Sequence, residues 1–122
     1  MRVFQTIAFL LIFSIVATGA GPINGDWSGV IKVANMDLRL AFHVTESDKG
    51  LQATFDSIDQ KVLGMPVEKI EVKGQQVKFE IGVIQAVYTG TLDKAGTTIT
   101  GSWSQVGQVI PVKFQKTAQA KK

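Results

Sequence analysis

The fold class is decided by the stretch Met36-Asp37-Leu38-Arg39-Leu40-Ala41-Phe42-His43-Val44, in which the character of the side chain changes at every second residue. Its large apolar residues occupy alternate positions, and the residues between them are polar or small. A period of two is typical of a half-buried β-strand, whereas a helix would scatter these apolar residues around its axis. The stretch therefore predicts a strand with one face in a core.

The same alternation recurs through the rest of the chain. The other stretches that show it are Trp27–Val33, Leu51–Asp56, Glu68–Lys73, Val77–Ile81, Tyr88–Leu92, Thr98–Trp103 and Ile110–Phe114. Glycine and other turn residues separate them, and short connections force neighbouring strands to be antiparallel. The sequence therefore predicts an all-β domain of eight antiparallel strands, arranged as an up-and-down meander that curls into a small barrel of lipocalin-like or avidin-like shape.

Two places depart from this pattern. Residues 59–66 lack alternation and form the longest irregular segment, with room for a helical turn. Pro111 lies inside the last expected strand, where it cannot donate a hydrogen bond to a neighbour. Proline in a strand indicates a free edge or a bulge, so the barrel is expected to be incompletely closed.

The first 20 residues have the features of a secretory signal peptide. Arg2 supplies the positive start, an apolar run extends from Ile7 to Val16, and small residues lead to Ala20. The run is shorter than the roughly 20 residues of a membrane-spanning helix, so cleavage after Ala20 is favoured over an uncleaved anchor. The expected location is the periplasm or the extracellular space, with no stable membrane span in the mature protein.

Composition limits what the remaining chain can be. Of its 122 residues, 21–116 are expected to form one domain and 117–122 a basic disordered tail. Removing Arg2 with the leader leaves 12 basic residues against 10 acidic ones, and outside the C-terminal lysines the two signs alternate. This pattern does not favour nucleic-acid binding. The absence of cysteine excludes disulfides and thiolate metal sites.

No catalytic residues and no metal site are predicted. The chain contains neither a Gly-x-Ser-x-Gly elbow nor a Ser-x-x-Lys pair. His43 is the only histidine; a general base or a pH-sensitive contact is one reading, and a solvated strand residue is the favoured one. Asp56 and Asp59 are interpreted as turn-forming residues rather than as ligands of calcium or of a substrate. No cofactor is expected, and the chain is predicted not to be an enzyme.

Large aromatic residues on the inward phase of the strands are the candidate ligand contacts. They are Trp27, Phe42, Phe55, Tyr88 and Trp103. An eight-stranded barrel is just wide enough either to be filled by side chains or to hold one small ligand. Both possibilities remain, and a filled interior with the two tryptophans as plugs is favoured because the inward residues are so bulky.

Several motifs together resemble a known kind of domain. They are Gly25-Asp26-Trp27-Ser28-Gly29, Leu38–Val44, Ala53–Gln60 with Gly64–Val67, Tyr88–Leu92 and Thr98–Gln105. In combination they resemble the N-terminal β domain that precedes the catalytic domain of some exported bacterial serine hydrolases, of the α/β-hydrolase and serine β-lactamase-like kinds. Because the chain ends at Lys122, where the hydrolase domain would follow, the resemblance implies a β module without the hydrolase's catalytic residues.

The expected function is binding. The leading hypothesis is an exported β module that is accessory to an envelope or secreted serine hydrolase, and it depends on the resemblance. One alternative is a lipocalin-like carrier of a small apolar ligand, suggested by the inward tryptophans. Another is a stand-alone remnant of a hydrolase's N-terminal domain.

Overall fold

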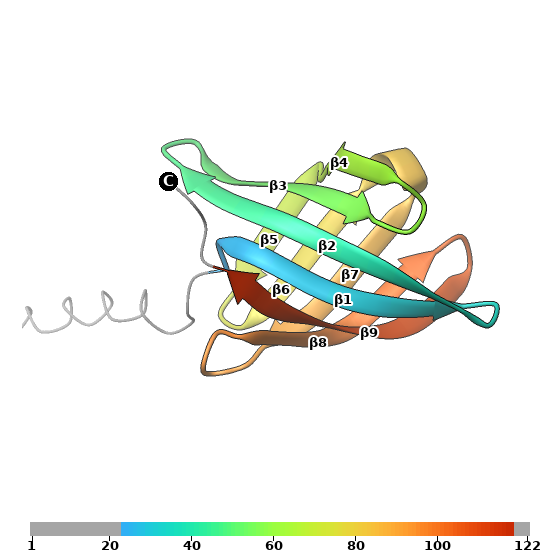
Figure 1. Cartoon of the computed structure of the whole chain (residues 1–122). Coiled ribbons are helices and arrows are strands. Elements are labelled where there is room, and N and C mark those ends of the chain that lie inside the picture. Colours follow the sequence, from blue (N-terminus) through green and yellow to red (C-terminus); the bar gives the residue numbers. More distant parts are fainter. Residues whose placement is uncertain (1–22, 119–122) are drawn as a thin grey trace, which may run out of the picture.

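The computed structural model describes residues 23–118, which form nine β-strands and one turn of 3-10 helix (Figure 1). No α-helix occurs among these residues. The elements are β1 (Gly25–Val33), β2 (Met36–Ser47), β3 (Gly50–Ser57), β4 (Val62–Pro66), β5 (Lys69–Lys73), β6 (Gln76–Ile81), η1 (Gly82–Ile84), β7 (Ala86–Leu92), β8 (Thr98–Gln105) and β9 (Gln108–Ala118).

All nine strands belong to one curled antiparallel sheet, in the order β4-β3-β2-β1-β9-β8-β7-β6-β5. Successive strands pair as a meander except for β4 and β5, and β1 pairs with β9, which brings the two ends of the domain together (Figure 1). The strands β4 and β5 are the two edges of the sheet. The predicted all-β meander and its incomplete closure are therefore confirmed.

The strand count is nine rather than the predicted eight because the irregular segment contains β4. This short strand pairs with β3 through Thr54–Pro66 and Phe55–Met65, and the register then shifts before Ser57 meets Val62. A bulge of this kind breaks the period of two. The alternation on which the prediction relied is consequently absent from a segment that is nevertheless extended.

The expected free edge at Pro111 is present. Strand β9 pairs with β1 only from Phe114 onward, opposite Gly29 and the residues before it. Pro111 is paired with Ser102 of β8 and has no strand partner on its other side among the described residues. The two strands separate beyond this point, so the sheet is open between the end of β1 and the start of β9.

Aromatic side chains fill the middle of the half-barrel. Phe42 lies at the centre, with its ring centroid 5.1 Å from that of Phe55, 4.3 Å from Phe79 and 5.0 Å from Phe114. The Tyr88 hydroxyl is buried among them and donates a hydrogen bond to the carbonyl of Val112 at 2.7 Å. Burial of the phenol raises its pKa. The centre of the domain is thus a packed core.

A glycine pair allows β7 and β8 to approach closely on the inner face. Gly90 is paired with Gly101 across the two strands. A methyl group at Gly101 would collide with the carbonyl of Thr89 and the Cα of Gly90, and one at Gly90 would lie 2.7 Å from Ile99 Cγ2. Only glycine fits at this pair, because backbone atoms occupy the space of a side chain.

Both ends of the chain extend beyond the described residues. The expected signal peptide, 1–20, lies outside the described residues, as do 119–122. Strand β9 runs to Ala118, two residues into the expected tail. Within residues 23–118, none of the helical structure has the length and apolar character that a membrane crossing requires.

Candidate functional site: the apolar end of the half-barrel

The two ends of the half-barrel are built from different turns. One end, here called the apolar end, consists of the turn Ala34–Asn35, residues 58–61, η1 and the turn Val106–Gly107. The opposite, polar end carries the turn Asp48–Lys49, the turn Gly74–Gln75 and residues 93–97. The first group contains Ile58, Val83, Ile84 and Val106 beside the polar residues 59–61, whereas the second contains no large apolar residue.

Exposed apolar side chains are concentrated at the apolar end. Within residues 23–118, six of the seven large hydrophobic residues that are exposed lie in or next to its turns, namely Met36, Val62, Leu63, Val83, Val106 and Val109. The seventh, Val30, lies within β1 opposite Arg39. Leu63 is 68% exposed and Val106 is 76% exposed. Single exposed apolar residues are ordinary, so it is their collection at one end that distinguishes this end from the other.

The turns of the apolar end form a rim, and a pocket of about 570 Å³ opens inside it. Residues from β1, β2, β3, β4, η1 and β8 line it, and its wall is mainly aliphatic with Phe55 and Trp103 at its base. No charged side chain lines it. Pockets that bind organic groups are typically apolar with a few placed polar atoms, and this pocket fits that description.

The polar groups of the pocket are largely occupied by one another. Trp103 donates from Nε1 to Oε1 of Gln105 at 3.0 Å, and Gln105 in turn donates to the carbonyl of Ile84 at 2.9 Å. The buried hydroxyl of Ser57 donates to Oε1 of Gln60 at 2.6 Å. The side-chain N–H groups of Gln60 have no hydrogen-bond partner within residues 23–118.

The β8–β9 turn combines exposure with backbone strain. Val106 has φ 43° and Gly107 has φ 80°, so both turn residues are left-handed. A β-branched residue is poorly suited to this conformation, and asparagine or glycine would be the stable choice at its position. Val106 is thus unfavourable both as a turn residue and as an exposed side chain, which neither folding nor solubility accounts for.

The five predicted ligand contacts are all buried, but they do not form one site. Phe42, Phe55 and Tyr88 belong to the central aromatic core. Of the five, only Phe55 and Trp103 line the pocket at the apolar end, with their ring centroids 5.1 Å apart.

The two tryptophans lie toward opposite ends. Trp27 is fully buried near the polar end, where its Nε1 donates to the carbonyl of Ile23 at 2.8 Å and Lys116 Nζ lies 5.3 Å from the ring centroid. Trp103 lies toward the apolar end. Its strand, β8, is separated from β1, the strand of Trp27, by β9. One tryptophan plugs the half-barrel while the other is the base of the pocket.

His43 is not the solvated residue that was expected. It faces outward as predicted, but its Nδ1 lies 2.8 Å from Asp26 Oδ1 and its Nε2 lies 2.7 Å from Asp56 Oδ2. Partial burial lowers the pKa of His43, but the hydrogen bonds and charges of the two aspartates outweigh it and raise the pKa above its ordinary value. The His43 side chain ties β1 to β3 across β2.

Register could have revealed this cluster from the sequence. A two-residue turn pairs Val33 with Met36, and counting back along the hairpin places Asp26 opposite His43. The next hairpin, with Ser47 opposite Gly50, places Asp56 diagonally across from the same histidine.

The two aspartates that were interpreted as turn residues hold the β3–β4 connection. Asp56 Oδ1 accepts from the Gly64 N–H at 2.8 Å. Asp59 accepts from the Arg39 guanidinium at 2.7 Å and from the Arg39 backbone N–H at 2.7 Å, and these hydrogen bonds lower the pKa of Asp59. Both carboxylates therefore shape the rim that carries Val62 and Leu63.

The described part of the chain shows where its potential metal ligands and its histidine lie. It contains no group of three or more histidine, cysteine, aspartate or glutamate residues placed to hold a metal ion. His43 is bonded through both ring nitrogens to aspartates, so neither nitrogen is open to a nucleophile or substrate. Comparisons with protein families, curated proteins and solved structures found no match.

Proposed function

We propose that this chain is an exported binding module that docks through its apolar end onto an apolar surface of a partner protein. The observation that supports this most directly is the segregation of exposed hydrophobic residues to one end of the half-barrel. Interface centres are depleted of charge and rich in apolar groups, which matches the pocket at this end, whose lining includes no charged side chain.

The rim favours a protein partner over a wholly enclosed ligand. A carrier of a small molecule buries its ligand inside, so its outer rim has no reason to be apolar. Here Leu63 and Val106 project at the turns, beyond the pocket. Their exposure costs free energy in the isolated domain, and that cost is relieved when a second surface covers them.

The proposed partner is an envelope or secreted serine hydrolase. This identity depends on the resemblance to β domains that precede such hydrolases, and an accessory role is what that resemblance implies. A module of this kind would occupy on its partner the position that a covalently linked N-terminal domain takes in the longer proteins.

Capture of labelled hydrolases tests the proposal. An extract of exported proteins is treated with a fluorophosphonate, which labels reactive serines, and passed over the immobilised mature domain. We expect a labelled hydrolase to be retained by the native domain and lost from the double variant Leu63→Ser with Val106→Ser. The matched control is Lys94→Ser at the polar end, which should retain it. Retention by the double variant, or no labelled protein at all, would refute the proposal.

A second candidate is a carrier of a small apolar ligand, favoured by the pocket over Phe55 and Trp103. A brominated fatty acid that enters the pocket would quench Trp103, whereas Trp27 is buried near the other end. Saturable quenching that disappears in Met65→Glu, with unchanged folding, would support the carrier. Emission that stays constant up to the solubility limit of the fatty acid would exclude it.

A further inference from the structure

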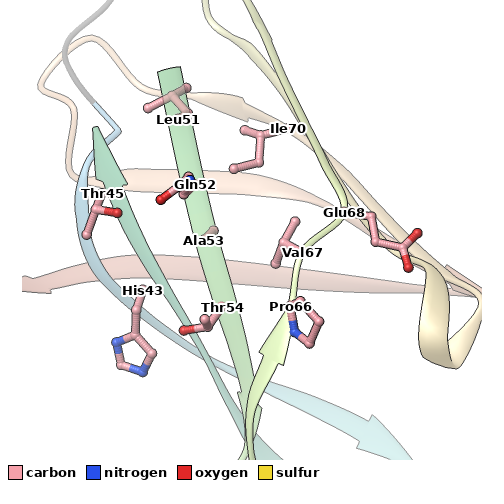
Figure 2. A pocket seen from close by; sticks show the side chains of 10 residues that line it. All are labelled: His43, Thr45, Leu51, Gln52, Ala53, Thr54, Pro66, Val67, Glu68 and Ile70. Atoms are coloured by element: carbon pink, nitrogen blue, oxygen red, sulfur yellow. The ribbon is translucent and has the colours of Figure 1, made fainter. Parts of the chain in front are cut away.

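A second surface, separate from the apolar end, lies between strands β3 and β5. It is a groove of about 550 Å³ that opens toward the polar end, shown in Figure 2. Its apex is the connection between β4 and β5, where the Val67 N–H bonds to the Ala53 carbonyl at 3.0 Å and the Glu68 N–H bonds to the Glu80 carbonyl at 2.8 Å. From this apex β3 and β5 diverge, and the two strands do not pair.

Both strands present unpaired backbone to the groove. On β3, the Ala53 carbonyl points toward the groove because it accepts from Val67, so by alternation the N–H and C=O of Leu51 point the same way. Strand β4 pairs with β3 only from Thr54 onward, so within residues 23–118 the groove side of Leu51 has no strand partner.

Strand β5 is unpaired on the facing side. The Glu80 carbonyl points toward β5, so the next alternate residues of β6, Lys78 and Gln76, also bond in that direction. Their register partners on β5 are Glu71 and Lys73. The backbone groups of the residues between, Ile70 and Val72, therefore point into the groove.

The side chains of the groove have the two-sided character of a gap in a sheet. Its inner wall carries Leu51, Val67 and Ile70, which pack against the core and are partly buried. In Figure 2, Val67 and Ile70 project into the space beside β3, while Thr45 and His43 lie on the outer side. A strand in this gap would alternate apolar inward residues with polar outward ones.

We propose that the groove between β3 and β5 binds an extended acidic-flanked peptide of another protein, which adds as a strand and completes the half-barrel. A polypeptide backbone matches two unpaired strand edges, because strand addition supplies donors and acceptors at strand spacing. The inward side chains of the peptide would cover Leu51 and Ile70. This site does not depend on the docking proposed for the apolar end.

Charge selects the peptide and disfavours a second copy of this chain. The outward residues of β5 are Lys69, Glu71 and Lys73. A second β5 in antiparallel register about Glu71 would place lysine opposite lysine, and like charges directly opposite are destabilising. Lysines on an edge strand are also a known protection against pairing of edges between copies. The complementary outward pattern is glutamate, lysine, glutamate.

The first experiment titrates the mature domain with a capped peptide, glutamate-valine-lysine-valine-glutamate, and follows backbone amide resonances. The peptide reads the same in charge in either direction, so parallel and antiparallel addition both satisfy it. We expect saturable shifts at Leu51, Ile70 and Val72, with at least about tenfold slower amide exchange at Leu51 and Val72. The control peptide lysine-valine-glutamate-valine-lysine, which has the charges of β5 itself, should bind at least about tenfold more weakly.

Two variants separate strand addition from nonspecific contact. Val72→Pro removes an N–H that points away from β6, a position at which proline is tolerated, and should abolish binding; Val72→Ala keeps the N–H and should retain it. Should Val72→Pro fail to fold, Lys69→Glu with Lys73→Glu tests the same site, because it should reverse the preference between the two peptides.

Three outcomes would overturn the proposal. The first is no shift with either peptide at millimolar concentration. The second is shifts confined to the apolar end, around Val62 and Val106. The third is a concentration-dependent dimer, detected by sedimentation, that Val72→Pro abolishes, since this would make a second copy the occupant. Loss of hydrolase capture alone leaves this proposal intact, because the two surfaces are altered by different variants.

Discussion

The two ends of the half-barrel enclose the same core, but one end is closed and the other is open. At the polar end, Trp27 closes the interior and the turns carry Asp48, Lys49 and Asp93. At the apolar end, Trp103 is the base of an open pocket and the turns expose valine and leucine. The same strands run to both ends, so this difference arises at the turns and at the residues next to them. The polar end has charged turns over a closed interior, whereas the apolar end has exposed apolar side chains around an open pocket.

The largest expected effect comes from removing the plug of the polar end. Trp27→Ala should lower the free energy of unfolding by about 3–5 kcal/mol, because it leaves a cavity in a fully buried site. Trp103→Ala should cost less, because its site already opens into a pocket. Urea unfolding of both variants measures the difference. Equal losses would mean that the two ends are packed alike.

A smaller loss is expected where the sheet is bent tightly. Gly101→Ala should destabilise the domain by about 1–3 kcal/mol, because the added methyl group meets the backbone of Thr89 and Gly90. Gly74→Ala, in an open turn at the polar end, is the comparison, since its cost is the positive φ of 61° rather than a collision. Thermal unfolding should place Gly101→Ala clearly below Gly74→Ala, and the reverse order would contradict the proposed packing.

Protonation of His43 should stabilise the sheet by about 1 kcal/mol or less, as is usual for partly exposed ion pairs. The pKa of His43 is raised in the folded state above its ordinary value of 6.5, so this contribution is complete below pH 6.5 and is lost as the pH rises through the folded pKa. Urea midpoints measured from pH 5.5 to 9 should fall over that window in the native domain.

The control for this titration is His43→Gln, which keeps a polar side chain between Asp26 and Asp56 but cannot gain a proton. Its urea midpoints should not show the same fall. A native profile that is flat, or that rises with pH through this window, would show that the aspartates do not favour the imidazolium.

The smallest effect has the opposite sign. Val106→Asn should stabilise the domain by about 0.5–1 kcal/mol, since asparagine suits the left-handed turn position better than valine. The same variant should weaken capture of a partner at the apolar end. Gained stability with lost binding would sharpen the contrast between the two ends, whereas lost stability would show that Val106 serves the fold.

Some of the structural features that the sequence analysis did not predict could have been inferred from the sequence. The pairing of Asp26 with His43 follows from the turn Ala34–Asn35 and the alternation of the first hairpin. It was not predicted because His43 is the only histidine and has no charged residue beside it along the chain. Strand β4 was less accessible, because its bulge removes the period of two that identifies a strand.

The sequence by itself determined eight of the nine strands, their inward faces, most of the turns and the free edge at Pro111, because alternation, turn chemistry and the missing N–H of proline are local properties of the chain. The tertiary structure alone decided two things: how the ends of the half-barrel differ, and which edges of β3 and β5 stay unpaired. These depend on contacts between segments that are distant along the chain, and on how strongly the sheet curls. The local sequence pattern does not specify the curvature of the sheet.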